Sequence, residues 1–255
     1  MDLTKRQILG VGITTNSKTE ILAFVTDYLQ KKSAKPLTIF TPNPEQLALA
    51  HKNNAFKNLL NSADIAIPDG FGLKLAVGKL TIIKGRELMV DLFVLANDLG
   101  LRVYILGSTK EVNDKVIEKV HMFYPKAKIR GWWGPKLDDK GNAASETDEH
   151  NDFHTRLHID KFNPDILLVG FGAPKQEFWV ANLIETTRVS RKIPIIMVVG
   201  GALDTFSGIK KAPPKLFESL GLEWLWRLIQ EPWRLGRQLR LIKYFLLVIK
   251  EKFVS

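Results

Sequence analysis

Asp69 is the side chain in this sequence best suited to acid–base chemistry. It follows the apolar residues 63–67 in the segment Ile67-Pro68-Asp69-Gly70-Phe71-Gly72, where packing does not require a carboxylate. A carboxylate that stays ionised at this position can take a proton from a hydroxyl group as a general base. An aspartate that caps a helix, with Asp-Gly as a turn pair, explains the same residues equally well.

Amide side chains and glycines follow two other predicted strands. In Thr41-Pro42-Asn43-Pro44-Glu45-Gln46, the amides offer donors and acceptors for sugar hydroxyls, although Asn43 alone is explained better as a helix cap. The segment Gly170-Phe171-Gly172-Ala173-Pro174-Lys175-Gln176-Glu177 combines glycines with Lys175 and Gln176 at a helix start. Helix amides and Lys175 together favour a diphosphate site over ordinary surface residues.

Two further glycine turns are less specific. Gly107 begins Gly107-Ser108-Thr109, which resembles a phosphate-binding turn but is explained better as a helix cap, because it lacks the glycine patterns of nucleotide-binding loops. Gly200 precedes Asp204 in a segment that ends at Gly208. Asp204 either contacts a ribose or base edge or caps a helix, and the residues leave both interpretations open.

Metal chemistry has little support in this sequence. His150, His154 and His158 recur at intervals of four and would share one face of a helix, but their polar surroundings favour an exposed loop. There is no Asp-x-Asp pair of the kind that holds Mg²⁺ or Mn²⁺ on a nucleotide sugar. We therefore expect no metal and no cofactor. With Cys 0, disulfides and cysteine-based catalysis are excluded.

Strand–turn–helix alternation places these motifs at strand ends. Residues 8–13 are predicted to form a strand or a strand with a turn, and further strands are predicted at residues 37–41, 63–67, 103–106, 127–131, 166–169 and 195–199. Helices are predicted at residues 18–32, 45–61, 71–77, 87–99, 111–123, 153–161 and 175–186, with a loop at 134–152. The pattern predicts an α/β fold with a mostly parallel sheet and helices on both faces. Parallel sheets bind ligands at the carboxyl ends of their strands, where all of these motifs lie.

The C-terminal segment is basic and rich in tryptophan. The net charge is +10, and residues 209–255 carry ten Lys and Arg against four Asp and Glu. Trp, Leu and Arg recur at helical spacing, which favours a basic amphipathic helix on an anionic membrane; a helix packed on the domain is the alternative. We divide the chain into a core at residues 1–220 and an appendage at 221–255.

No run approaches the roughly 18 apolar residues of a spanning helix, and no signal peptide is visible. We therefore expect a cytoplasmic protein that is peripheral at the inner face of the cell membrane.

Taken together, these segments resemble the WecG/TagA/CpsF glycosyltransferase family. The matching pieces are TPNPEQ (41–46), ADIAIPDGFG (63–72), YILGS (104–108), LLVGFGAPKQEFW (167–179), VGGALDTFSGIKKAPP (199–214) and GLEWLWRLIQEPWRL (221–235). They occur in family order and cover nearly the whole chain after residue 10.

The resemblance implies a Rossmann-like core and an inverting, metal-independent transferase. The implied reaction moves N-acetylmannosamine, or a related hexose, from a UDP-sugar to undecaprenyl-diphosphate-linked N-acetylglucosamine. This reaction serves the synthesis of wall teichoic acid or another surface polysaccharide. By the family pattern, Asp69 is the catalytic base, and Thr41, Asn43 and Gln176 line the sugar pocket.

The appendage of similar family members completes the site at the membrane, which implies roles for Arg227, Arg234 and Arg237. The expected partners are the UDP-sugar, the lipid-linked acceptor and an anionic membrane surface, without nucleic acid; a homo-oligomer is a further option. One segment departs from the family stretch Arg-Val-x-Gly-x-Asp-Leu, because Ile82 replaces the Arg and Glu87 the Asp. This departure leaves the donor sugar open.

The alternative function is a protein that binds nucleic acid or anionic lipid without transferase activity, since aromatic and Arg side chains also form nucleic-acid platforms.

Overall fold

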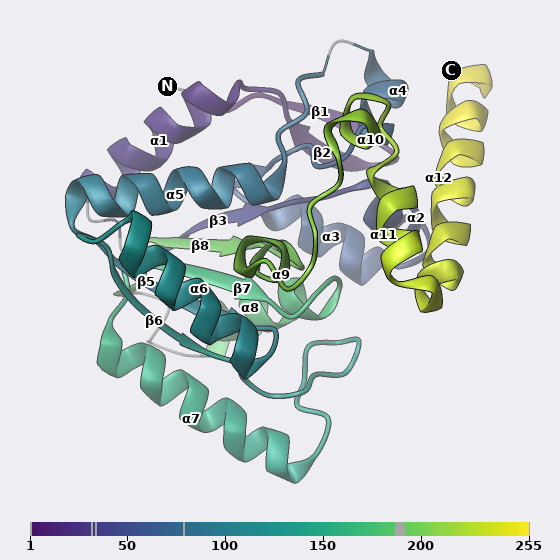
Figure 1. Cartoon of the computed structure of the whole chain (residues 1–255). Helices are drawn as coiled ribbons and strands as arrows, with labels where there is room; N and C mark the ends of the chain where they lie inside the picture. The colour runs from purple at the N-terminus through teal and green to yellow at the C-terminus, as the bar shows by residue number, and fades with distance from the viewer. Residues whose placement is uncertain (1, 32, 34, 79, 187–191, 255) are drawn as a thin grey trace.

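The computed structural model describes residues 2–31, 33, 35–78, 80–186 and 192–254, without the side chains at 234, 237, 238 and 252–254. At its centre lies a six-stranded sheet (Figure 1). Its strands are β3 (Leu37–Phe40), β4 (Ile65–Ala66), β5 (Arg102–Gly107), β6 (Lys128–Trp132), β7 (Ile166–Gly170) and β8 (Ile195–Val198). They pair in the order β4-β3-β8-β7-β5-β6, and every pair is parallel, which confirms the predicted sheet.

Alternation along each strand distributes apolar side chains over both faces of the sheet. In β8, Ile195 and Met197 belong to one hydrophobic cluster, whereas Ile196 and Val198 belong to another on the opposite face. All four side chains are fully buried. This two-sided burial explains why the strands are continuous apolar runs in the sequence.

Helices cover both faces of the sheet (Figure 1). One cluster is closed by α1 (Lys18–Gln30), α5 (Gly85–Leu99), α6 (Lys110–Phe123) and α9 (Ala202–Ser207). The other is closed by α2 (Pro44–Lys52), α3 (Asn54–Ser62), α7 (Glu146–Phe162), α8 (Lys175–Thr186) and α12 (Leu235–Val254). The short helix α4 (Gly72–Val77) follows β4 at the edge of the sheet. The predicted α/β architecture with helices on both faces is therefore confirmed.

The C-terminal segment folds against this core. It forms α10 (Lys215–Ser219), α11 (Glu223–Gln230), the 3₁₀ turn η2 (Pro232–Arg234) and then α12. Tyr244 of α12 is fully buried, and its hydroxyl donates to the Gly72 carbonyl at 3.1 Å. Val248 belongs to the same hydrophobic cluster as the apolar face of α2. The boundary at residue 221 and the basic amphipathic character of the tail stay predictions.

Of the two alternatives for residues 8–13, a strand or a strand with a turn, the structure confirms the second. Residues 8–13 span the turn between β1 (Lys5–Ile8) and β2 (Val11–Thr14), which form a separate antiparallel hairpin. The turn residues Leu9 and Gly10 have positive φ angles of 49° and 78°. Glycine tolerates this backbone geometry because it has no Cβ.

The predicted helix at residues 45–61 is two helices. Helix α2 ends at Lys52, and the Asn53 side chain accepts a hydrogen bond from the Phe56 amide at 3.0 Å. This bond caps the start of α3. Asn53 therefore ends one helix and begins the next within a continuous helical pattern.

The predicted loop at residues 134–152 is wrong from Glu146 onward. Helix α7 begins there, and the Ser145 hydroxyl caps it by accepting from the Asp148 amide at 3.2 Å. Acidic residues in a first turn are stabilised by the helix dipole. The polar composition that favoured a loop therefore belongs to a helix start.

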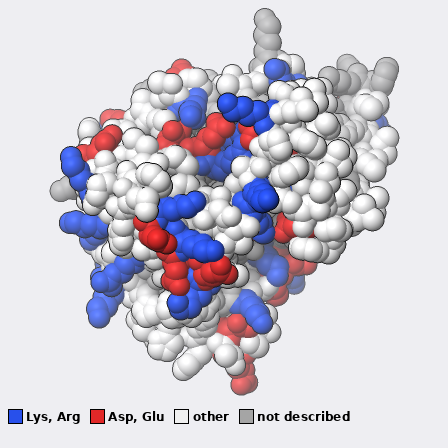
Figure 2. Space-filling view, viewed as in Figure 1, with Lys and Arg blue, Asp and Glu red and all other residues white. Residues whose placement is uncertain are grey.

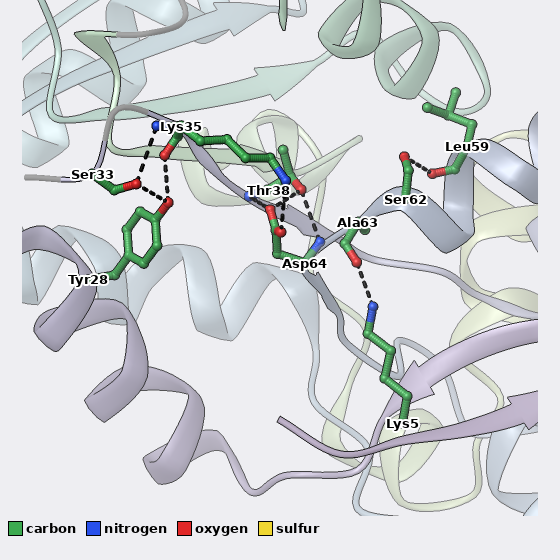
Figure 3. A network of polar contacts seen from close by, with 9 residues as sticks. All are labelled: Lys5, Tyr28, Ser33, Lys35, Thr38, Leu59, Ser62, Ala63 and Asp64. Carbon is green, nitrogen blue, oxygen red and sulfur yellow. Dashed lines mark hydrogen bonds and ion pairs between the residues drawn. The ribbon is translucent and has the colours of Figure 1, made fainter. Parts of the chain in front are cut away.

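A hydrogen-bond network joins β3 and β4 at their amino ends (Figure 3). The Asp64 carboxylate accepts from the Thr38 backbone N–H at 2.9 Å and from the Thr38 hydroxyl at 2.7 Å. The same hydroxyl accepts from the Asp64 amide at 3.0 Å, and Lys35 pairs with Asp64 at 3.4 Å. These bonds set the register of two strands whose opposite ends carry Thr41 and Asp69.

Candidate active site

A polar cavity lies at the carboxyl ends of β3, β4, β7 and β8, where parallel sheets bind ligands. It contains about 1000 Å³ of space, including the part that opens to solvent. Figure 2 shows Lys and Arg side chains gathered beside Asp and Glu on the face that carries α9, α10 and α11. The predicted site residues that line the cavity are Thr41, Asn43, Asp69, Gln176, Gly200 and Arg227.

Asp69 is held half-buried in this cavity directly after β4. Its backbone N–H donates to the Pro42 carbonyl at 3.1 Å, which ties together the loops that follow β3 and β4. Burial raises the pKa of the Asp69 carboxyl to about 6; Arg227 opposes this rise and Glu223 adds to it. A carboxyl group with this pKa is mostly ionised at neutral pH and can act as a general base.

Gly85, the first residue of α5, brings a backbone amide close to this carboxylate. A Cβ atom at Gly85 would lie 3.0 Å from Thr41 Cγ2 and 3.6 Å from Asp69 Oδ2. The Gly85 N–H hydrogen-bonds Asp69 and lowers the pKa of its carboxyl. A side chain at this position would therefore crowd both Thr41 and Asp69.

Asn43 and Thr41 form the floor of the cavity after β3. The Asn43 side-chain oxygen accepts from the Gln46 amide at 3.0 Å and caps α2, as the sequence favoured. Asn43 also lines the cavity, so the cap and the site share one residue. Thr41 beside it is 6% exposed.

Gln176 connects the loops that follow β7 and β8. Its side-chain oxygen accepts from the Gly172 and Gly200 amides, both at 3.1 Å. Its side-chain NH₂ donates to the Glu177 carboxylate at 2.9 Å. Gln176 is 1% exposed, so its amide acts as a buried clamp within the cavity wall.

Two residues of the predicted glycine-containing motifs, Gly107 and Lys175, lie outside the cavity lining. A Cβ atom at Gly107 would lie 2.6 Å from the Gly170 carbonyl carbon, so this glycine allows β5 and β7 to end in close backbone contact. The Lys175 ammonium donates to the Leu137 carbonyl instead. Their predicted roles in substrate binding stay predictions.

Asp204 also lies outside the lining. Its carboxylate accepts from the Ser108 hydroxyl and pairs with the Lys210 ammonium at 2.7 Å. This arrangement joins the turn after β5 to α9 and the segment beyond it. The side chains of Arg234 and Arg237 lie outside the described residues, so their predicted roles are not placed by the structure.

The chain matches the model of the WecG/TagA/CpsF glycosyl transferase family over residues 6–255. A similar protein is the N-acetylglucosaminyldiphosphoundecaprenol N-acetyl-beta-D-mannosaminyltransferase of Bacillus subtilis (strain 168), which is 32% identical over 235 residues, 89% of this chain and 85% of the relative. The protein of the same name from Staphylococcus aureus (strain MW2) is 30% identical over 241 residues, 91% of this chain and 87% of the relative. The chain belongs to the WecG/TagA/CpsF glycosyltransferase family.

Part of the cavity wall comes from the appendage. Glu223 and Arg227 of α11 face Asp69 across the cavity. Lys84 pairs with Glu218 of α10 at 2.7 Å and with Glu223 at 3.4 Å. Arg86 also pairs with Glu218. These ion pairs connect the start of α5 to α10 and α11.

Ile82 and Glu87, where the sequence departs from the expected family stretch, both lie outside the cavity lining. Ile82 packs against the hydrophobic core and is not among the cavity-lining residues. Lys84 and Arg86 line the cavity, and Glu87 lies 3.6 Å from Lys84. The segment therefore still brings positive charge to the site, although from different positions.

A second, more apolar cavity adjoins the first. It lies between the Asp69 loop, α11 and α12. Its apolar lining includes Pro44, Phe71, Trp224, Leu241 and Phe245. Asp69 and Arg227 line both cavities, so the candidate base stands where the polar and the apolar spaces meet.

The three histidines are exposed, as expected, but they lie on α7 rather than in a loop. The rings of His150 and His154 are 5.3 Å apart, and His158 contacts Trp132. No set of three His, Asp or Glu side chains suited to hold a metal ion occurs within the described part of the chain.

Several lining residues were not among the predicted site residues. They are Glu45, Gln46, Lys84, Arg86, Thr205, Glu223 and Arg240, with the buried Glu177 behind Gln46 and Gln176. Gln46 and Glu177 lie inside the quoted motifs, so the motifs themselves could have indicated them. Glu223 and Arg240 follow no strand, and their place depends on how the appendage packs.

None of the helices in the described ranges is long and apolar enough to cross a membrane. The outer side of the appendage nevertheless exposes large apolar side chains. Trp233 is 78% exposed, and a helical stripe along α12 is exposed at Leu235, Leu239, Ile242, Leu246 and Ile249.

Proposed function

We propose that this glycosyltransferase moves N-acetylmannosamine, or a related hexose, from a UDP-sugar to undecaprenyl-diphosphate-linked N-acetylglucosamine. The names of the relatives from Bacillus subtilis and Staphylococcus aureus state this acceptor and this sugar for those proteins. Such a reaction would serve teichoic acid or related surface-polymer synthesis. Family membership favours this function over the alternative of a binding protein without transferase activity.

The position of Asp69 between two unlike cavities carries the proposal. The polar cavity suits a sugar nucleotide, and the apolar cavity suits the first part of a prenyl chain. An acceptor that enters by the apolar cavity brings its hydroxyl to Asp69. Asp69 takes the hydroxyl proton while the oxygen attacks the anomeric carbon, and the bond to UDP breaks on the opposite face.

The leaving UDP carries negative charge that needs compensation. Lys84, Arg86 and Arg227 line the polar cavity and can stabilise that charge as it develops. No step in this scheme requires a metal ion. Gln176 holds the cavity wall in place through Gly172 and Gly200.

The membrane is the proposed location of the acceptor. The exposed apolar stripe on α12 is flanked by Arg240, Lys243 and Lys250, and such surfaces bind anionic lipid interfaces. Each basic residue near such a surface contributes on the order of 1 kcal/mol. We expect Leu239→Ser together with Leu246→Ser to weaken binding to vesicles that contain phosphatidylglycerol. Normal vesicle binding by that double variant would contradict this location.

A donor panel tests the reaction itself. The full chain is incubated with UDP-N-acetylmannosamine, UDP-N-acetylglucosamine, UDP-glucose and UDP-N-acetylmannosaminuronic acid, together with a soluble analogue of the lipid-linked acceptor. We expect mass spectrometry to show addition of one N-acetylhexosamine from UDP-N-acetylmannosamine. Product from a different donor would revise the sugar, and no product from any donor would overturn the proposed function.

A further inference from the structure

Glu177 is a buried carboxyl group that the proposed reaction does not use. It lies in the first turn of α8 and is 0% exposed. One carboxylate oxygen, Oε1, accepts from the Gln176 side chain at 2.9 Å and from the Gln46 side chain at 3.4 Å. Both glutamines line the polar cavity, so Glu177 lies directly behind its wall.

Two buried acceptor atoms in this cluster are unpaired. Glu177 Oε2 and Gln46 Oε1 are both buried, and neither has a hydrogen-bond partner among the described residues. Leaving a buried acceptor unpaired costs free energy, and a buried charge without a partner costs more. A single proton on Glu177 would remove both defects, because the acid O–H can donate to the Gln46 oxygen.

We propose that Glu177 is a protonated carboxylic acid in the resting enzyme and that it positions both glutamines of the cavity wall. The acid and the Gln46 amide then form a two-bond ring, with Gln46 NH₂ donating to Oε1 and Oε2–H donating to Gln46 Oε1. Gln176 is oriented by the same carboxyl group, so its oxygen faces the two glycine amides. Only the kinetic test of this proposal depends on the proposed function.

The surroundings of Glu177 support a neutral acid. Burial raises the pKa of the Glu177 carboxyl to about 7, against the opposing effects of the Gln176 hydrogen bond and its own backbone amide. The strands β7 and β8 beside α8 carry no titratable residue. The titratable residues of α2 and α3 are Glu45, His51, Lys52 and Lys57, and those of α8 itself are Lys175 and Glu185; none of them contributes to the shift.

Glu177→Gln is the decisive variant because glutamine imitates the protonated acid. Its oxygen can accept from both glutamines, and its NH₂ can donate to Gln46 Oε1. A native carboxyl with a raised pKa binds its proton more tightly than the unfolded chain, so wild-type stability falls as pH rises from about 4.5 through about 7. Glu177→Gln has no carboxyl group at this position, so its stability does not fall for this reason over the same pH range. We expect wild type to lose roughly 3–5 °C in Tm relative to Glu177→Gln between pH 6 and pH 8.

Infrared spectroscopy reads the proton directly. The difference spectrum of wild type minus Glu177→Gln should show the C=O band of a protonated carboxylic acid at pH 6, which disappears with a midpoint near pH 7. Glu185→Gln, an exposed change on the same helix, is the control and should keep the wild-type band and the wild-type pH dependence of Tm. Both readouts are independent of substrate, so they stand even if the proposed donor is wrong.

Kinetics separates positioning from packing. Glu177→Gln should keep KM for the UDP-sugar within about threefold of wild type at pH 6.5, whereas Glu177→Leu should raise it at least tenfold, since Gln176 and Gln46 lose their common partner. If Glu177→Gln lacks the predicted Tm difference, shows no acid band, or loses as much activity as Glu177→Leu, the proposal is overturned. Those outcomes would mean that Glu177 acts as a charge or as packing alone.

Discussion

The two walls of the cavity are held in different ways. On the core side, Thr41 and Gln176 are buried, and Gln176 makes hydrogen bonds to Gly172, Gly200 and Glu177. On the outer side lie α10, at the end of the core segment, and α11 of the appendage; this outer side, called the appendage wall, contains no buried residue among those described in the two helices. Their contact with the opposite wall depends on Glu218 and Glu223, which pair with Lys84 and Arg86.

This contrast separates a fixed wall from an adjustable one. Buried hydrogen bonds in a low-dielectric core are strong and costly to leave unmade. Partly exposed ion pairs contribute little each and are screened by salt. We expect substitutions in the core wall to have large effects that are insensitive to salt, and substitutions in the appendage wall to have smaller effects that depend on ionic strength.

Asp69→Asn tests the core wall and should have the largest effect. It removes the proposed base while keeping the side-chain volume, so kcat should fall by about 10²–10⁴. The change should leave Tm nearly unaltered, which circular dichroism can check. Asp114→Asn, an exposed change on α6, is the matched control. Full turnover by Asp69→Asn with the lipid-linked acceptor would remove Asp69 from catalysis.

The pH dependence of the reaction follows from the same carboxyl group. Burial raises the pKa of Asp69 to about 6, and only the ionised form can accept a proton. We therefore expect kcat/KM to approach a tenfold fall for each pH unit below about 6. A profile of kcat/KM that is flat from pH 5 to pH 8 would contradict this role.

Arg227→Ala tests the appendage side chain whose positive charge acts on Asp69. In the proposed reaction, Arg227 stabilises the negative charge on the leaving UDP. Loss of a hydrogen bond to a charged group costs about 1.5–3 kcal/mol, so kcat/KM should fall roughly 10- to 100-fold. Arg227 also lowers the pKa of Asp69, so the acid limb of the pH profile should move to higher pH. Arg6→Ala is the control, because the exposed Arg6 of β1 lines neither cavity. An unmoved acid limb would mean that Arg227 does not act on Asp69.

Glu218→Gln should have the smallest effect on kcat/KM. It is the most direct test of the difference between the core wall and the appendage wall. It weakens the ion pairs with Lys84 and Arg86, which should lower kcat/KM about two- to fivefold at low salt. At roughly 1 M salt, where the Debye length is about 3 Å, the difference from wild type should vanish. A defect that persists at high salt would place Glu218 among the fixed parts of the site.

The fold was largely predictable because apolar strands, glycine turns and helical spacing are local signals. The turn of the antiparallel hairpin was predicted only as one of two alternatives, because Leu9 and Gly10 lie inside a continuous apolar run. The start of α7 was missed because acidic capping residues have the composition of a loop. Both cases concern boundaries, where capping and turn chemistry outweigh periodicity.

The site was predictable where a residue lies close after a strand. Thr41, Asn43, Asp69 and Gly200 lie in loops that follow strands, Gln176 opens the helix after such a loop, and all five line the cavity. The ion pairs of Lys84 and Arg86 with Glu218 were not predictable, because they join segments more than 130 residues apart whose proximity depends on tertiary packing. Lys175 shows the opposite case. It lies in a motif that predicted the site, but its ammonium group donates to the Leu137 carbonyl and does not line the cavity.

The close backbone contact between Gly107 and Gly170 limits how the ends of β5 and β7 can change. A Cβ atom at Gly107 would lie 2.6 Å from a backbone carbon, so these two strand ends admit almost no variation. The appendage wall has exposed side chains and no such contact at Arg227 or Glu218. A new sugar preference, whether it arises by natural divergence or in laboratory selection, should therefore appear first as substitutions in α10 and α11, while the strand ends are inherited unchanged.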